Sequence, residues 1–147
     1  MHPYSYSLSL RISHPQLNPD DVSRVLPLTP KKSWRAGEDR FNRIDGKVYG
    51  QYTTGYWYCN LGEGERDRNF LNDYIEECVR RLAGHANYFR EIATSGGRVE
   101  FFVAWYGVGN IGECFQSGLL RQLGEMSIDL SLDVYPTLPE KSSEIES

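Results

Sequence analysis

The sequence has few cysteines and no long apolar run. Its three cysteines, Cys59, Cys78 and Cys114, follow no regular spacing, which favours reduced thiols over a disulfide framework. No stretch approaches the roughly 18 apolar residues of a membrane-spanning helix. The N-terminus, MHPYSYSLSLRIS, lacks the basic and apolar segments of a secretory signal. We therefore expect a cytoplasmic protein that makes no contact with a membrane.

An excess of positive charge is also missing. The formal net charge is −4 over 147 residues, whereas nucleic-acid-binding domains typically present a basic patch. Residues 98–105, RVEFFVAW, partly match an RNA-recognition strand, but Glu100 stands where a stacking aromatic side chain is required and Val99 replaces a glycine. We expect no nucleic-acid partner.

Catalytic and metal-binding motifs are absent. His2, His14 and His85 have neither the spacing of metal ligands nor a neighbouring cysteine. No GxSxG motif occurs, and the glycines of LGEGERD lack the lysine and threonine of a phosphate-binding loop. Asp129 and Asp133 would lie about 13 Å apart along a strand, farther than the roughly 5–9.5 Å between paired catalytic carboxyl groups. We expect no metal and no cofactor, we assign no catalytic residue, and a protein without enzymatic activity is favoured.

Strands are predicted first by strict alternation of apolar and polar residues. Residues 4–12 and 128–134 alternate at every step, which indicates strands with one buried face and one polar face. Residues 99–106 are apolar on both faces and predict a central strand. The remaining strand predictions are residues 56–61, a hairpin that turns at Asp45-Gly46, and a second hairpin in GVGNIGECF.

Helices are predicted in three places. In LNPDDVSRVLP, Asn18 is suited to cap a helix at 19–26. Residues 69–95 repeat apolar side chains at helical spacing, and Gly84 interrupts them, which predicts a kink or two consecutive helices. Ser117 is suited to cap a third helix that closes at Gly124.

The order of these elements predicts an α+β fold. We expect a two-layer sandwich in which a mostly antiparallel sheet of about four to six strands carries helices on one face. The other face should be exposed to solvent, because its strands alternate strictly between apolar and polar residues. The length predicts a single domain, which we place at residues 1–135. The tail 136–147, PTLPEKSSEIES, is expected to be disordered.

The order and spacing of several segments resemble a known family. These segments are the serine-rich first strand, the capped helix NPDDVSRVL, the stretch TPKKSWRAGE, the tryptophan of YWYC, the long paired helices and a last strand ending in Val134-Tyr135. Together they resemble the bacterial family known as domain of unknown function 4279, over residues 4–135. The resemblance implies the fold and implies no reaction.

The stretch TPKKSWRAGE, residues 29–38, is the leading candidate for a site. In one interpretation, Trp34 folds back as a lid on the edge of the core and the charged residues are solvated. In the other, the stretch is a recognition loop, because tryptophan and arginine are enriched at binding hot spots and the two lysines can meet an anionic group. The candidate binding residues are Lys31, Lys32, Trp34, Arg35, Glu38 and Trp57.

Two classes of function remain open. The favoured class is a non-catalytic interaction or regulatory module, such as an immunity protein, that binds a protein partner or itself through the aromatic and charged loops near Trp34 and Trp57. The alternative is a small-ligand-binding protein or an unrecognised enzyme, with a pocket between residues 29–38 and the sheet. Trp34, Arg35 and Glu38 would line that pocket.

Overall fold

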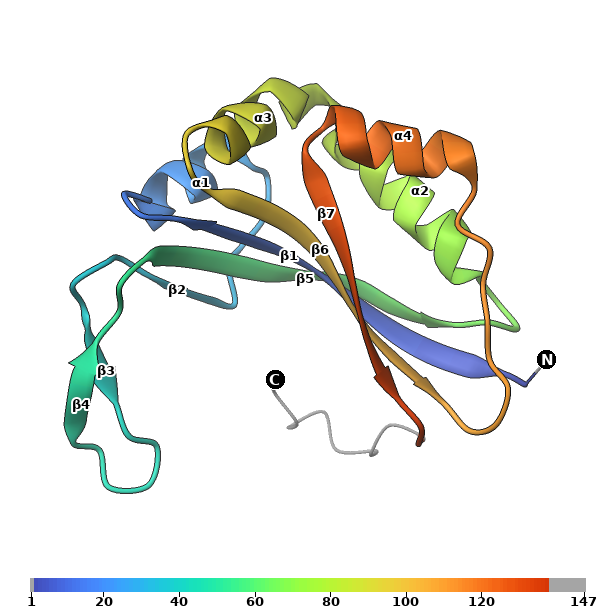
Figure 1. Ribbon diagram of the computed structural model, residues 1–147, viewed down its shortest axis with the longest axis horizontal. Coiled ribbons are helices and arrows are strands. Elements are labelled where there is room, and N and C mark those ends of the chain that lie inside the picture. The colour runs from blue at the N-terminus through green and yellow to red at the C-terminus, as the bar shows by residue number, and fades with distance from the viewer. Residues whose placement is uncertain (1, 138–147) are drawn as a thin grey trace.

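The structure is a computed structural model, and it describes residues 2–137. In this range five strands form one sheet and two more form a separate hairpin (Figure 1). The spatial order of the sheet is β2 (Lys32–Trp34), β5 (Gly55–Glu65), β1 (Tyr4–His14), β6 (Arg98–Gly107) and β7 (Ile128–Tyr135). Neighbouring strands run antiparallel, except that β6 and β7 are parallel. The predicted fold class is confirmed.

β1 lies in the middle of the sheet and separates its two faces. Its apolar side chains point to one face, and its serines and Arg11 point to the other, as the alternation predicts. The apolar side chains are almost entirely removed from water: Tyr4, Tyr6, Leu8, Leu10 and Ile12. The neighbouring strand β6 contributes Val99, Phe101, Val103 and Trp105 to the same core.

The helices lie together on the buried face of the sheet (Figure 1). They are α1 (Pro19–Val25), α2 (Leu71–Leu82), α3 (Ala86–Thr94) and α4 (Ser117–Glu125). A 3₁₀ turn, Ala83–His85, separates α2 from α3, so the predicted interruption at Gly84 is confirmed. Helix α2 buries a stripe at helical spacing, formed by Leu71, Ile75, Cys78, Val79 and Leu82.

The start of α2 is tied to β1 by a buried polar contact. The residue before the helix, Phe70, offers no capping side chain. Instead, the Tyr4 hydroxyl accepts a hydrogen bond from the Leu71 N–H at 3.0 Å and donates one to Glu113 Oε2 at 2.7 Å. Free N–H groups at a helix start need such partners, so Tyr4 joins the sheet, α2 and the segment that leads to α4.

Three local predictions need correction. The segment GVGNIGECF forms no second hairpin; it is irregular and leads into α4, because β6 continues to β7 by a parallel crossover rather than by an antiparallel turn. Helix α4 is preceded by Gln116, with Ser117 as its first residue, and no side chain caps it by a hydrogen bond. Residues 29–38 are not entirely a loop, because Lys32–Trp34 pairs with β5 as the edge strand β2.

The hairpin that was predicted at Asp45-Gly46 is confirmed. Strands β3 (Asp39–Phe41) and β4 (Val48–Gln51) pair antiparallel, and Gly46 takes a φ of 70° in the turn. The hairpin extends away from the sheet (Figure 1). Of the tail predicted at 136–147, residues 138–147 lie outside the described residues.

Gly62 and Gly84 form a matched pair for testing the packing of α2 on β5. Gly62 has a φ of 149°, and a Cβ there would come 1.8 Å from the Tyr74 hydroxyl, which donates to the Leu61 carbonyl. Gly62→Ala is expected to lower the free energy of unfolding by about 1–3 kcal/mol. Gly84 has open space around it, so Gly84→Ala is expected to raise stability by up to about 1 kcal/mol. Urea denaturation of both variants measures the difference, and equal losses would contradict this packing.

Stability at high pH is expected to depend on Tyr4. Burial raises the pKa of Tyr4 to about 12 from its usual value near 10, and the carboxylate of Glu113 adds to the rise. The stabilisation from neutral Tyr4 is therefore complete below pH 10 and is lost as the pH rises toward 12. Tyr4→Phe removes both hydrogen bonds, should cost about 1–3 kcal/mol at neutral pH, and should make the loss of stability above pH 10 shallower. An unchanged profile in the variant would contradict this role.

Candidate functional site: the helix-free face of the sheet

The face of the sheet opposite the helices carries a continuous set of aromatic and charged side chains. We call it the helix-free face, because no helix of residues 2–137 covers it (Figure 1). The strand register places its members side by side, since directly paired residues point to the same face. The members used below are Arg11, Lys32, Trp34, Tyr56, Tyr58, Glu100, Phe102, Tyr106, Asp129, Ser131, Asp133 and Tyr135.

A stack of aromatic rings occupies the edge of this face at β2. Trp34 lies between two tyrosines, with ring centroids 4.0 Å from Tyr52 and 4.6 Å from Tyr56, both in stacked geometry. The Trp34 Nε1 donates to the Thr54 carbonyl at 3.1 Å. The row continues through Tyr58, 5.8 Å from Tyr56. Trp34 is half-buried, and it packs against Tyr52 and Tyr56 rather than against the core cluster.

An arginine continues the row across the central strands. The guanidinium of Arg11 lies 3.6 Å from the ring centroid of Phe102 on β6 and 5.7 Å from that of Tyr58 on β5. Such cation–π contacts are worth about 0.5–2 kcal/mol. Burial raises the pKa of Tyr56 to about 12, although the positive charge of Arg11 opposes that rise.

The β7 side of the face is acidic and internally bonded. Arg98 contacts Asp129 at 2.9 Å and Glu100 at 3.0 Å, and the hydrogen bond to Asp129 raises the pKa of Arg98. The Ser131 hydroxyl donates to Glu100. Beside this cluster the Tyr135 hydroxyl donates to Asp133. The face therefore changes along the sheet, from aromatic side chains with Lys32 at β2 to acidic side chains at β7.

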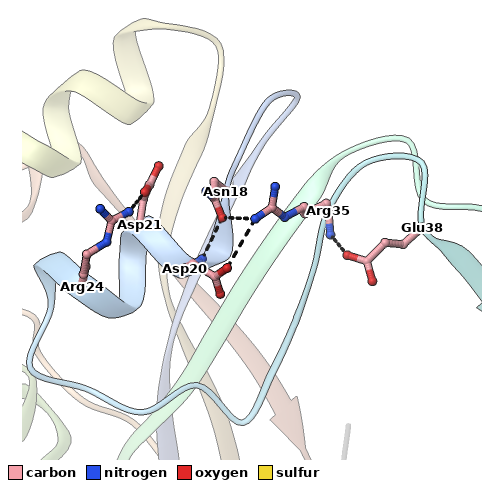
Figure 2. Close-up of polar contacts among 6 residues, drawn as sticks. All are labelled: Asn18, Asp20, Asp21, Arg24, Arg35 and Glu38. Atoms are coloured by element: carbon pink, nitrogen blue, oxygen red, sulfur yellow. Dashed lines mark hydrogen bonds and ion pairs between the residues drawn. The ribbon is translucent and has the colours of Figure 1, made fainter.

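Arg35 and Glu38 shape the turn that follows β2 (Figure 2). Arg35 Nη2 donates to Asn18 Oδ1 at 2.8 Å and lies 3.3 Å from Asp20 Oδ2, so it ties the turn to the start of α1. Glu38 accepts a hydrogen bond from the backbone N–H of Arg35. The Arg35 guanidinium is directed toward α1, where Asn18 and Asp20 hold it (Figure 2).

The remaining predicted residues fall into two environments. Lys31 and Lys32 are exposed at the sheet edge, and the backbone N–H of Lys31 donates to the Tyr58 carbonyl at 2.8 Å. Trp57 is instead fully buried among the core side chains, and its Nε1 donates to Ser23 Oγ at 3.1 Å. Trp57 therefore belongs to the core, and the recognition role predicted for it does not fit its burial.

The comparison with protein families matches nearly the whole chain. The model described as Domain of unknown function (DUF4279) covers residues 3–137. The chain belongs to the DUF4279 family. No curated protein and no solved structure matches the chain.

Several members of the site in this DUF4279 chain are not singled out by the amino-acid sequence. Tyr56 and Tyr58 flank Trp57 in YWYC, and strand parity alone would have placed them on the face opposite to Trp57. The contact between Arg11 and Phe102 had no local signal. Those residues are 91 positions apart, and only the pairing of β1 with β6 brings them together.

A small cavity lies on the helix side of the DUF4279 domain. Its volume is about 150 Å³ and its lining residues are Pro27, Leu28, Leu61, Cys78, Arg81 and Leu82. Arg81 Nη2 donates to Cys78 Sγ at 3.2 Å. Burial raises the pKa of the Cys78 thiol, and the hydrogen bond from Arg81 opposes that rise. This cavity is at a different place from the pocket predicted between residues 29–38 and the sheet, because none of residues 29–38 lines it.

Within residues 2–137 no three histidine, cysteine, aspartate or glutamate side chains gather as metal ligands. In the same range no helix is long and apolar enough to span a bilayer. All three cysteines are free thiols, and of these Cys114 alone is exposed.

The aromatic stack at β2 is expected to be an energetic unit. In a double-mutant cycle, Trp34→Ala and Tyr52→Ala should be coupled by about 0.5–1.5 kcal/mol, because each removes the same stacking contact. Trp34→Ala and Tyr49→Ala serve as the control pair, since Tyr49 is an exposed hairpin aromatic and no ring contact joins it to Trp34. The free energies of unfolding from urea titrations give both couplings. A coupling near zero for Trp34 with Tyr52 would contradict a rigid stack.

Proposed function

We propose that this DUF4279 protein is a non-catalytic interaction module that binds a protein partner through the β2–β5 side of its helix-free face. The observation that carries the proposal is the row of aromatic side chains in which Tyr52, Trp34 and Tyr56 stack, supported at its inner end by the tilted and buried ring of Tyr58. Aromatic rings that are already held in place lose little conformational freedom on binding, and tryptophan, tyrosine and arginine are enriched at hot spots.

The charges on this side of the face favour a partner with acidic residues. Lys31 and Lys32 are exposed beside the aromatic stack, whereas Glu100, Asp129 and Asp133 lie toward the opposite edge of the sheet. Complementary charges accelerate association and fix the orientation of a partner. A regulatory or immunity-type role in the cytoplasm is consistent with such a module, and three free thiols support a reducing compartment.

A small-ligand-binding function is the second candidate, and the cavity beside Arg81 favours it. Four of its lining residues are apolar, and the exposed Arg81 supplies a positive charge. An apolar cavity of about 150 Å³ is large enough for one benzene ring. The matching ligand is therefore a small organic anion, with an apolar body no larger than a ring and one carboxylate.

The first proposal predicts which substitutions abolish binding. A partner captured on the immobilised protein from lysate of the native host is purified, and its affinity is measured by calorimetry. Trp34→Ala and Lys32→Glu are each expected to weaken binding at least about tenfold, a loss of at least roughly 1.4 kcal/mol. Phe70→Ala is the matched control, because Phe70 is an exposed aromatic that precedes α2 and takes no part in the stack. Binding that survives both site variants and fails with Phe70→Ala would contradict the proposal.

The second candidate is tested with benzoate and with benzyl alcohol, which lacks the charge. Benzoate should raise the melting temperature of the wild type, because a ligand that binds only the folded state stabilises it, and benzyl alcohol should have a smaller effect. Arg81→Gln should remove the difference between the two compounds. Leu61→Phe should fill the cavity and reduce the response to both. If benzoate has no effect at millimolar concentration, this candidate is wrong.

A further inference from the structure

The two edges of the sheet differ in a way that matters for association. An edge strand leaves backbone N–H and C=O groups free to pair with another chain, and proteins usually limit this by keeping edge strands short. β2 spans Lys32–Trp34, which is three residues, and so follows that rule. β7 spans Ile128–Tyr135, which is eight residues, and in the described part of the chain β6 is its one hydrogen-bonded neighbour.

The β7 edge also exposes apolar side chains. Leu132 and Val134 point to the helix side, since they pair with the buried Val103 and Trp105 of β6. Their exposed fractions are nevertheless 41% and 52%, whereas Ile128 at the start of the same strand is 4% exposed. The first part of β7 is thus covered, and the last part combines a free backbone edge with uncovered apolar side chains.

We propose that β7 pairs in antiparallel orientation with β7 of a second copy of this chain, with Leu132 on the two-fold axis. The two sheets would then join into one continuous sheet, with all helices on the same side. The pairing would cover Leu132 and Val134 and satisfy the free backbone groups at the edge. This inference uses a surface other than the β2–β5 side of the helix-free face and stands independently of the proposed function.

The aspartates of β7 select the register. In an antiparallel pair around a two-fold axis, the residues on either side of the axial residue face their mirror positions in the second copy. An axis at Ser131 would set Asp129 opposite Asp133, and an axis at Asp133 would set that residue opposite itself. Like charges directly opposite one another destabilise a strand pair. Both of these registers are therefore disfavoured.

An axis at Leu132 avoids both clashes. Leu132 then faces its own copy, Leu130 faces Val134, Ser131 faces Asp133 and Asp129 faces Tyr135. The apolar pairs lie on the helix side and the polar pairs on the helix-free face. An axis at Leu130 also separates the aspartates, but its overlap would end at Leu132 and would leave Val134 uncovered.

Disulfide trapping tests the register directly. All variants carry Cys114→Ser, because Cys114 is the exposed native thiol. Leu132→Cys is expected to form a disulfide-linked dimer on mild oxidation, since facing residues of an antiparallel pair have Cα atoms about 4.5–5.5 Å apart and disulfides need Cα atoms about 4.4–6.8 Å apart. Leu130→Cys should not, because its two copies would lie about 13 Å apart along the strands. Linkage at Leu130 instead of Leu132, or at neither position, would overturn the proposal.

Sedimentation equilibrium tests the dimer without cross-linking. The wild type is expected to show a concentration-dependent mass that approaches twice that of the chain. Leu132→Lys should be monomeric, because two lysines would face one another. Val25→Lys is the matched control: Val25 has a similar exposed fraction of 40% but lies on α1, which contacts β5 rather than β7. A wild type that remains monomeric at millimolar concentration, or a dimer that Leu132→Lys leaves intact, contradicts the inference.

Discussion

Burial of alternate side chains of β1 and β6 beneath the helices is the interaction on which the rest of the structure depends. Leu8, Leu10 and Phe101 are 0% exposed, and each fully buried side chain of this kind contributes about 1.5–3 kcal/mol. A shift of one residue in the pairing of these strands would exchange the two faces of the sheet. The same burial therefore fixes which side chains remain on the helix-free face.

This constraint explains how one strand can contribute side chains both to the core and to the candidate site. On β5, Trp57 and Cys59 enter the core, and Tyr56 and Tyr58, which alternate with them, lie on the opposite face. On β6, Phe101 is buried, and Phe102 stacks beneath Arg11. The aromatic row of the candidate site is thus held by strands whose other side is anchored in the core, so its rings keep their spacing without a ligand.

Much of the fold could be predicted from the sequence, because its signals are local. Strict alternation identified β1 and β7, capping residues identified α1, and Gly84 marked the break between α2 and α3. The predictions that were wrong concern features that depend on how segments distant in the sequence pair with one another. Nothing within GVGNIGECF indicates that β7 will lie parallel to β6, and three residues are too few for β2 to show a period.

The candidate site also combines residues that the sequence indicates with residues that only strand pairing and burial place. Trp34 stands out in the sequence because it lies in a charged stretch, and the structure places it in an aromatic stack. The sequence also suggests Trp57 as a binding residue, but its position in β5 directs it into the core, where it is fully buried. Arg35 and Glu38 stood out as charges, and the structure uses them to hold a turn against α1 (Figure 2). The β2–β5 pairing brings Tyr56 to Trp34, and the β1–β5 pairing brings Arg11 to Tyr58. Tyr52 lies between β4 and β5, and no sequence pattern indicates that it stacks on Trp34.

The accessibility of adjacent positions on β6 shows which face of the sheet the helices cover. Val103 is fully buried on the helix side, and Ala104 lies half-buried on the helix-free face. In a chain that also carries Cys114→Ser, the rate of thiol labelling is measured under native conditions for Val103→Cys and Ala104→Cys. We expect Ala104→Cys to react rapidly, whereas Val103→Cys should react only at the rate at which the sheet opens. Equal and slow labelling at both positions would show that the face assigned to binding is covered, and would contradict the proposed binding face.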